Sequence, residues 1–329
     1  MSPLLIIFIA TALVFDFLNG FHDSANVVAT MISSRAMSPR RALLLSASAH
    51  FVAPFLFGVA VATTIGQQVL QPYANTMATV FAALIAAIVW NVITWLFGIP
   101  SSSSHALIGG LVGATIVGYG IDAIQPHGLM KVVVALLLSP LVGLIGGYVF
   151  MKLVLFLARG SSPRINWFFK RGQTFTALAL ALSHGTNDAQ KTMGIITMVL
   201  VGAGVLKQFR VPLWVIAASA GTVSLGTAMG GWRIIRTLGG RFYKIRPVHG
   251  FTAQLTSAVV ILAAALLGGP VSTTQVVSSA ILGVGSAERL SKVRWGVAGS
   301  IVTAWLLTIP ASGLLAALAY MIVRFIIPL

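Results

Sequence analysis

The sequence predicts an all-α membrane protein, a polytopic bundle of helices that cross a bilayer. Of its 329 residues, 57% are hydrophobic and only 8% are charged, whereas soluble domains carry about 25% charged residues. The mean hydropathy is +0.97. The apolar runs show no polar alternation and are long enough to cross about 30 Å of hydrocarbon, which favours helices over a β-barrel. These runs are 42–65, 77–98, 132–157, 211–231, 255–268 and 295–327.

The formal net charge of +16 comes from basic residues that gather in four short loops. Short Lys- and Arg-rich loops mark the cytoplasmic face of a membrane protein, so both termini are expected outside. The same side chains are expected to contact anionic lipid headgroups, and this placement argues against nucleic acid as the partner. The four groups are Arg35, Arg40 and Arg41; Arg159, Arg164, Lys170 and Arg171; Arg233, Arg236, Arg241, Lys244 and Arg246; and Arg289, Lys292 and Arg294.

The apolar stretch 79–117 lies between two uncharged loops, 66–76 and 118–130, which this topology puts on the same side. The stretch must therefore enter the membrane and return, and it is broken at Gly98-Ile99-Pro100. Together with the first span, 42–65 and 131–157, it gives about five crossings. Because this number is odd, a second half with the same plan must be inverted. The predicted organisation is a first repeat at 1–157, a basic cytoplasmic linker at 158–173 and a second repeat at 174–329.

Two motifs recur in the same order in both halves. Residues 20–26 read GFHDSAN and residues 185–191 read GTNDAQK, an offset of 165 residues. Residues 100–105 read PSSSSH and residues 270–275 read PVSTTQ, an offset of 170 residues. Inverted repeats with helices interrupted at corresponding positions indicate a transporter whose binding site lies near the bilayer midplane.

Three of the five acidic residues, Asp16, Asp23 and Asp188, lie in apolar surroundings. A carboxylate placed there is costly unless it faces a cavity or a partner. Asp23 and Asp188 belong to the repeated motif, so we expect them to bind the coupling ion or proton. Asp16 precedes Asp23 by two helical turns and shares its face. It lines the same cavity or hydrogen-bonds to a neighbouring helix.

Other polar residues of the motifs extend the expected ion site. His22 and His105 suit proton movement because histidine titrates near physiological pH, although His105, like His184, could instead brace a helix start. Asn26 and Asn187 offer amide groups to the same site. Lys191 either pairs with Asp188, three residues earlier on a helix, or offers its charge to an anionic substrate.

Hydroxyl side chains over the first turn of the helix after each proline supply the expected substrate chemistry. A helix N-terminus offers free N–H groups and a partial positive charge, which suit a tetrahedral oxyanion, and hydroxyls add adaptable donors. Some of these residues could instead be ordinary N-caps. The predicted substrate residues, with Lys191, are Ser101, Ser102, Ser103, Ser104, Ser272, Thr273, Thr274 and Gln275.

On these motifs, the chain resembles the inorganic phosphate transporter (Pit) family of Na⁺- or H⁺-coupled phosphate symporters, whose signature is G-x-N-D-x-A-N followed by P-x-S-S/T-T-H. The resemblance implies inverted halves with two re-entrant hairpins that bind phosphate with cations near the centre. His22 and Lys191 stand where many members have asparagine, and Gln275 where they have histidine. With His22 in the first motif and Gln190-Lys191 in the second, the chain is similar to the bacterial proton-coupled, low-affinity branch of the family. This resemblance implies phosphate import across the plasma (inner) membrane.

Several alternatives remain open at this stage. The cargo could be sulfate, or a neutral metal–phosphate complex in place of free phosphate, and the coupling ion could be Na⁺ in place of H⁺. An enzyme is not expected, because adjacent residues such as Ser104 and His105 do not face each other on a helix. No cofactor and no structural metal are predicted, and the absence of cysteine excludes thiolate ligands. The oligomeric state is open, a homodimer included.

Overall fold

The computed structural model describes residues 2–240 and 243–326, with Lys292 described by its backbone alone. Over these residues the chain is helical and contains no strand, which confirms the predicted fold class. Three short 3₁₀ turns, at Pro72–Ala74, Ile121–Ala123 and Leu290–Lys292, lie in the connections. The helices are α1 (Pro3–Ser33), α2 (Pro39–Leu56), α3 (Ala60–Gln68), α4 (Met77–Phe97), α5 (Ser103–Tyr119), α6 (Pro126–Leu157), α7 (Ile165–Gly202), α8 (Leu213–Met229), α9 (Trp232–Gly240), α10 (Pro247–Leu266), α11 (Thr273–Glu288) and α12 (Trp295–Ile326).

The helices make a multi-pass membrane protein. In the described part of the chain, five helices are long and apolar enough to cross a bilayer: α1, α4, α6, α10 and α12. Two bent pairs raise this number to as many as seven, since α2 and α3 meet at 71° and α8 and α9 at 68°. Helix α7 has 38 residues but falls outside this group. Its apolar run is interrupted in the middle by the polar motif 184–191.

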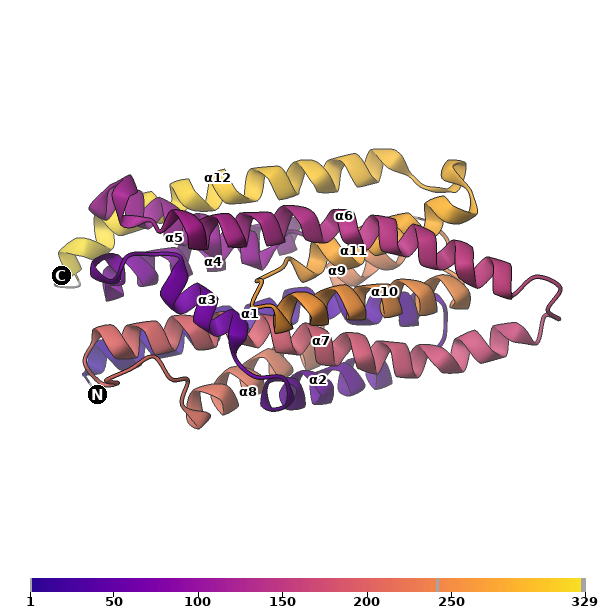
Figure 1. Cartoon of the computed structure of the whole chain (residues 1–329), viewed down its shortest axis with the longest axis horizontal. Coiled ribbons are helices and arrows are strands. Elements are labelled where there is room, and N and C mark those ends of the chain that lie inside the picture. Colours follow the sequence, from indigo (N-terminus) through magenta and orange to yellow (C-terminus); the bar gives the residue numbers. More distant parts are fainter. Residues whose placement is uncertain (1, 241–242, 327–329) are drawn as a thin grey trace.

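The two halves repeat one order of elements: a long helix, a bent pair, a hairpin of two helices and a second long helix. Both termini lie at one end of the bundle and the α6–α7 connection at the other, so α1 and α7 run in opposite directions (Figure 1). Hairpins α4–α5 and α10–α11 occupy opposite ends of the bundle (Figure 1). The halves are therefore inverted relative to each other.

Glycines with a left-handed backbone occur at matching breaks in the two halves. The hairpin turns contain Gly98 and Gly268, with φ of 65° and 71°. The bent pairs contain Gly58 and Gly230, with φ of 77° and 74°. L-residues with a side chain rarely adopt these angles, so glycine allows the chain to turn at each of the four positions.

The segment expected as a linker at 158–173 is a loop only as far as residue 164, because α7 begins at Ile165. Aromatic residues make the first turns of α7 helical by giving them a packing partner: Phe168 and Phe169 both contact Phe251 of α10. Lys170 and Arg171 are thus on the helix. The connections α1–α2, α6–α7 and α11–α12 all lie at the end opposite the termini (Figure 1). Arg241, from the third basic group, is outside the described residues.

Each half packs against the other. Helix α5 lies against α12, α11 against α6, α1 against α8 and α7 against α2. Glycines allow these close approaches: a Cβ on Gly113 would lie 2.1 Å from the carbonyl oxygen of Gly313, and one on Gly283 would lie 2.1 Å from that of Leu144. In lipid the hydrophobic effect does not drive helices together, because lipid tails are as apolar as the side chains. Helices there associate through close van der Waals packing, which small residues such as glycine allow.

A buried polar layer separates two apolar clusters. Along α1, Phe8 and Phe15 belong to one cluster and Ala25 to Met31 to the other. Along α7 the order is reversed, with Leu180 in the second cluster and Met193 in the first. The repeated motifs lie between the clusters on both helices, which puts them at mid-depth in the bundle.

Candidate substrate and ion site

The hairpin helices α5 and α11 begin with the same cap. Ser102 Oγ accepts a hydrogen bond from the N–H of His105 at 3.1 Å, and Ser272 Oγ accepts one from the N–H of Gln275 at 3.3 Å. Both serines satisfy a free N–H of a first helical turn, as N-caps do. Ser102 and Ser272 therefore shape the two helix starts.

The tips of the two hairpins touch at the centre of the bundle. Ser104 Oγ of α5 donates to the carbonyl oxygen of Val271 at 2.9 Å. Nε2 of Gln275 lies 3.5 Å from Nε2 of His105. The predicted pair of opposed N-termini is thus present in the described structure. Ser101 faces away from this contact, since its hydroxyl pairs with that of Thr94 at 2.7 Å.

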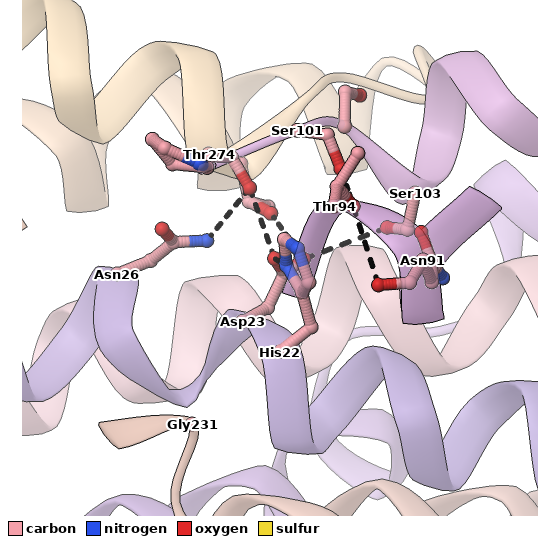
Figure 2. Close-up of polar contacts among 12 residues, drawn as sticks. His22, Asp23, Asn26, Asn91, Thr94, Ser101, Ser103, Gly231 and Thr274 are labelled. Atoms are coloured by element: carbon pink, nitrogen blue, oxygen red, sulfur yellow. Dashed lines mark hydrogen bonds and ion pairs between the residues drawn. The ribbon is translucent and has the colours of Figure 1, made fainter. Parts of the chain in front are cut away.

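Asp23 of α1 receives hydroxyl groups from both hairpins (Figure 2). Its Oδ1 accepts from Thr274 at 2.9 Å, and its Oδ2 accepts from Thr273 at 3.4 Å and Ser103 at 3.5 Å. Nδ1 of His22 lies 3.1 Å from Oδ1. Asp23 is 1% exposed. This carboxylate therefore gathers the donors expected to serve a substrate.

Asp188 of α7 is paired with a lysine, whereas the described ion-pair partner of Asp23 is the histidine His22. Lys191 Nζ donates to Asp188 Oδ1 at 2.5 Å, and His184 Nδ1 lies 3.1 Å from Oδ2. The hydroxyl of Thr273 lies between the two carboxylates, 3.4 Å from an oxygen of each. Lys191 is fully buried. The two halves thus bring unequal charges to one enclosed centre.

The two asparagines support the second hairpin. Asn26 Nδ2 donates to Thr274 Oγ1 at 3.0 Å (Figure 2). The same nitrogen lies 3.4 Å from His184 Nε2. Asn187 Nδ2 donates to the carbonyl oxygen of Gly269 at 3.3 Å. Among the described residues, neither amide oxygen has a hydrogen-bond partner. Each is thus free to ligate a small cation or to accept from one more donor.

The centre has the spacing of a cation site. Asp23, His184 and Asp188 each offer one ligand atom, and these atoms lie within 4.8 Å of one another. The ammonium of Lys191 already contacts Asp188 at this place. It supplies a fixed positive charge where a metal ion would otherwise compensate the carboxylates.

The structure brings the predicted site residues into one buried layer and adds two histidines to it. One is His184, for which the sequence left open a role in proton movement or in bracing a helix start, and the other is His50. His184 lies four residues before Asp188, a spacing that puts both on one helix face and could have identified it. The ring of His50 stacks on His184, with centroids 5.0 Å apart, and its Nδ1 lies 2.8 Å from Thr227 Oγ1. No sequence pattern indicated His50, because it belongs to no repeat.

Two further motif residues cap the broken helices of the opposite half. Gln190 Oε1 accepts from the N–H of Val61 at 2.7 Å and of Ala62 at 3.2 Å, at the start of α3. Ser24 Oγ accepts from the N–H of Gly231 at 2.8 Å, just before α9. Each motif therefore stabilises a helix break in the other repeat.

Comparison with known proteins identifies the family. The model of the "Phosphate transporter family" matches the chain twice, at residues 19–167 and 157–316. The chain belongs to the phosphate transporter family. Its members are transporters, so the chain is not an enzyme, and phosphate is the substrate of the family.

Several relatives in the phosphate transporter family are similar over nearly the whole chain. A "probable low-affinity inorganic phosphate transporter" of Rhizobium meliloti (strain 1021) is 46% identical, covering 97% of this chain and 96% of its own length. A protein of the same description from Bacillus subtilis (strain 168) is 45% identical, covering 98% of both. The solved structure titled "The sodium-dependent phosphate transporter" is 26% identical, with a TM-score of 0.89 over 99% of this chain and 100% of that one.

Proposed function

We propose that this family member imports inorganic phosphate by symport with protons. The observation that carries the proposal is the placement of Asp23, which accepts hydroxyls from both hairpin tips while Asp188 is already paired with Lys191. The carboxylate of Asp188 is thus compensated by the fixed charge of Lys191, whereas that of Asp23 depends on a cation or proton that binds and leaves.

Phosphate would bind between the N-termini of α5 and α11. Free N–H groups of the two first turns and the hydroxyls of Ser103, Thr273 and Thr274 supply donors on both sides. These donors suit the oxygens of a tetrahedral anion. The surroundings are buried, which strengthens each charge-assisted hydrogen bond.

Proton and phosphate binding would be coupled through Asp23. As a carboxylate, it repels an anion and holds the hydroxyl protons of Thr273, Thr274 and Ser103. When Asp23 is protonated, it no longer repels the anion. Its protonated oxygen also accepts hydrogen bonds less well, so these hydroxyls can turn to the phosphate oxygens. Phosphate therefore binds best when a proton is bound, which is the requirement for symport.

Lys191 favours a proton over Na⁺ as the coupling ion. Asn26, at the equivalent position of the first half, has an amide oxygen that can ligate a small cation, whereas Lys191 has only donors. Its ammonium compensates Asp188 permanently. The second half would then need no metal cation, and the mobile positive charge would be the proton on Asp23 with its neighbour His22.

The experiment is uptake of labelled phosphate in proteoliposomes with pH and sodium gradients imposed separately. A pH gradient, acidic on the outside, is expected to drive accumulation, and a sodium gradient at equal pH is expected to drive none. Accumulation that follows sodium alone would overturn proton coupling. Transport that persists with both gradients collapsed and never exceeds equilibration would indicate a channel.

Competition separates the candidate cargoes. A protonated Asp23 keeps one oxygen that can accept a hydrogen bond. Phosphate, which keeps a proton at neutral pH, can donate to this oxygen, whereas sulfate has no proton to donate. Excess sulfate is therefore expected to leave phosphate uptake nearly unchanged, and strong inhibition would reassign the substrate. Uptake measured with and without divalent metal distinguishes free phosphate from a neutral metal–phosphate complex.

We also propose that the basic loops face the cytoplasm and that both termini lie outside. The positive charges at the end opposite the termini support this orientation. Because the chain contains no cysteine, single variants such as Ser162→Cys and Tyr73→Cys can report it, both at exposed positions. An impermeant thiol reagent added to whole cells should label Tyr73→Cys and spare Ser162→Cys. The reverse labelling pattern would invert the topology.

A further inference from the structure

A second buried carboxyl group lies outside the central site. Asp16, two turns before Asp23 on α1, is fully buried where α1 packs against α7 and α8. Its Oδ2 lies 3.5 Å from the hydroxyl of Thr222 on α8, and Thr192 of α7 faces the same carboxyl. Among the described residues, Asp16 forms no hydrogen bond or ion pair with the hairpin residues of the central site, so it does not serve the substrate directly.

The polar atoms around Asp16 are incompletely paired. The hydroxyl of Thr192 faces the Asp16 carboxyl, but within the described residues neither this hydroxyl nor Asp16 Oδ1 has a hydrogen-bond partner within 3.5 Å. Neither side-chain atom of Asn19, one turn further along α1, has a partner, and this residue is also fully buried. Buried polar groups are nearly always satisfied, so such a group of orphans indicates a place that receives an additional partner.

The charges near Asp16 leave it uncompensated. The ionisable groups that act on its carboxyl are Asp188 and Lys191, both on α7, and Lys191 already pairs with Asp188. Helices α4 and α8, which also border α1 and α7, contain no ionisable residue. An ionised carboxylate buried without a partner is costly enough to become neutral instead.

The Thr222 hydroxyl has three acceptors within reach for its one proton. Its oxygen lies 2.9 Å from the carbonyl oxygen of Ala218, 3.1 Å from that of Ser219 and 3.5 Å from Oδ2 of Asp16, and it can donate to any of the three. The Ala218 carbonyl is the nearest of these acceptors. When Thr222 donates to that carbonyl, the hydrogen between its oxygen and Oδ2 has to come from Asp16, and a protonated carboxyl supplies it.

We propose that Asp16, supported by Thr222, Thr192 and Asn19, is a second proton-binding site, separate from the phosphate site. The proton is bound while α1, α7 and α8 close around the carboxyl and is released when this interface opens to water. The inference rests on the proposed proton symport and adds a carrier for one of its protons. Because Asp188 and Lys191 act on Asp16, loading this site is sensed at the central site.

The test uses the reconstituted full-length protein and three variants. Asp16→Asn imitates the protonated carboxyl permanently, Asp16→Glu keeps a titratable group, and Asp122→Asn is the control, since Asp122 is exposed at the start of the α5–α6 connection. Two transport modes are measured: phosphate–phosphate exchange at equal pH, and accumulation driven by a pH gradient of one unit. Infrared spectra of the purified proteins report the carbonyl band of a protonated carboxylic acid.

Asp16→Asn is expected to keep exchange within a factor of ten of the parent and to accumulate less phosphate. One coupled proton supports about tenfold accumulation per unit of pH gradient, so accumulation should fall by about that factor while the proton on Asp23 still drives the remainder. The acid carbonyl band should be present in the parent and in Asp122→Asn and missing in Asp16→Asn. If Asp16→Asn does not fold, Asp16→Glu decides: its carbonyl band and the pH profile of its exchange should both be shifted.

The contrary outcomes are distinct. Parent-like accumulation in Asp16→Asn, or an unshifted band and profile in Asp16→Glu, would overturn the proton site at Asp16. Sodium that raises the melting temperature of the parent and not of Asp16→Asn would make this a sodium site and overturn it equally. A parent that shows neither exchange nor accumulation would instead refute the proposed transport function.

Discussion

The ammonium of Lys191 lies 2.5 Å from Oδ1 of Asp188, and both side chains are buried at mid-depth in the bundle. The equivalent position in the first repeat is Asn26, which instead donates to Thr274 at 3.0 Å. The two repeats therefore share a backbone plan but differ in charge. The ammonium of Lys191 compensates the carboxylate of the second repeat, whereas in the described structure no lysine or arginine pairs with Asp23 of the first repeat, whose ion-pair neighbour is His22.

Replacing Lys191 by asparagine should create a dependence on sodium. The substitution leaves Asp188 buried without its partner, and breaking a buried ion pair in this way costs about 3–5 kcal/mol. A small cation held by Asp188, Asp23 and the new amide oxygen can recover part of that loss. We expect Lys191→Asn to melt at a lower temperature than the parent in sodium-free detergent, and sodium to raise its melting temperature.

The parent and Lys207→Asn, which changes an exposed lysine, should show no such sodium response. If Lys191→Asn melts like the parent with and without sodium, Lys191 is not the charge that compensates Asp188.

Asp23→Asn and Asp188→Asn should each abolish concentrative phosphate uptake while membrane insertion persists. Asparagine at 23 cannot exchange a proton with the site, and asparagine at 188 leaves Lys191 buried without a partner. Uptake in cells lacking other phosphate transporters gives the activity, and the amount of protein in the membrane fraction gives insertion. Parent-like transport by both variants would mean that the central site has been misplaced.

Removing one hydroxyl should weaken the binding of phosphate. Thr274 donates to Asp23 at 2.9 Å and accepts from Asn26 at 3.0 Å, and valine has nearly the same shape without these bonds. Each unsatisfied buried group costs about 1–3 kcal/mol, so we expect Thr274→Val to raise KM for phosphate about tenfold or more.

Thr256→Val is the matched control for Thr274→Val. Its hydroxyl only bonds back to the carbonyl oxygen of Thr252 at 2.9 Å, within α10. Its KM should stay close to that of the parent. An equal rise in KM in both variants would assign the effect to helix packing.

Gln190 should prove necessary for the bend between α2 and α3. Its Oε1 accepts from the N–H groups of Val61 and Ala62, and leucine would leave both donors buried and unpaired. At about 1–3 kcal/mol for each donor, Gln190→Leu should lower the melting temperature clearly in detergent. Gln67→Leu, at an exposed position, should change it little. A melting temperature for Gln190→Leu equal to that of Gln67→Leu would show that the bend does not depend on this cap.

The sequence predicted the general architecture because its signals are local. Apolar runs identify the helices, basic loops suggest an orientation, and the motifs at 20–26 and 185–191 reveal the repeat without any coordinates. The paired prolines, Pro100 and Pro270, likewise identify the two breaks whose helices begin with Ser102 and Ser272 as N-caps. Only the hydrogen bonds in the structure showed which of the hydroxyl residues are N-caps.

Other parts of the site depend on contacts between residues far apart in the sequence. His50 stacks on His184, Gln190 caps α3 and Ser24 bonds to the backbone before α9, and each contact joins helices that pack together only in the folded bundle. No spacing rule in one segment can encode such contacts. The start of α7 at Ile165 also differed from the expected linker, because its aromatic residues pack against Phe251.

The sequence alone determined that this chain is a helical membrane protein of two inverted halves with acidic, hydroxyl and basic residues at matched breaks. The length of the apolar runs and the spacing of the motifs can be read from the linear sequence, without knowledge of the tertiary structure. The tertiary structure decided which charges meet: Lys191 with Asp188, both hairpin tips with Asp23, and no basic side chain paired with Asp16 in the described structure. Electrostatic energy depends on distance and burial, which only the packed bundle fixes.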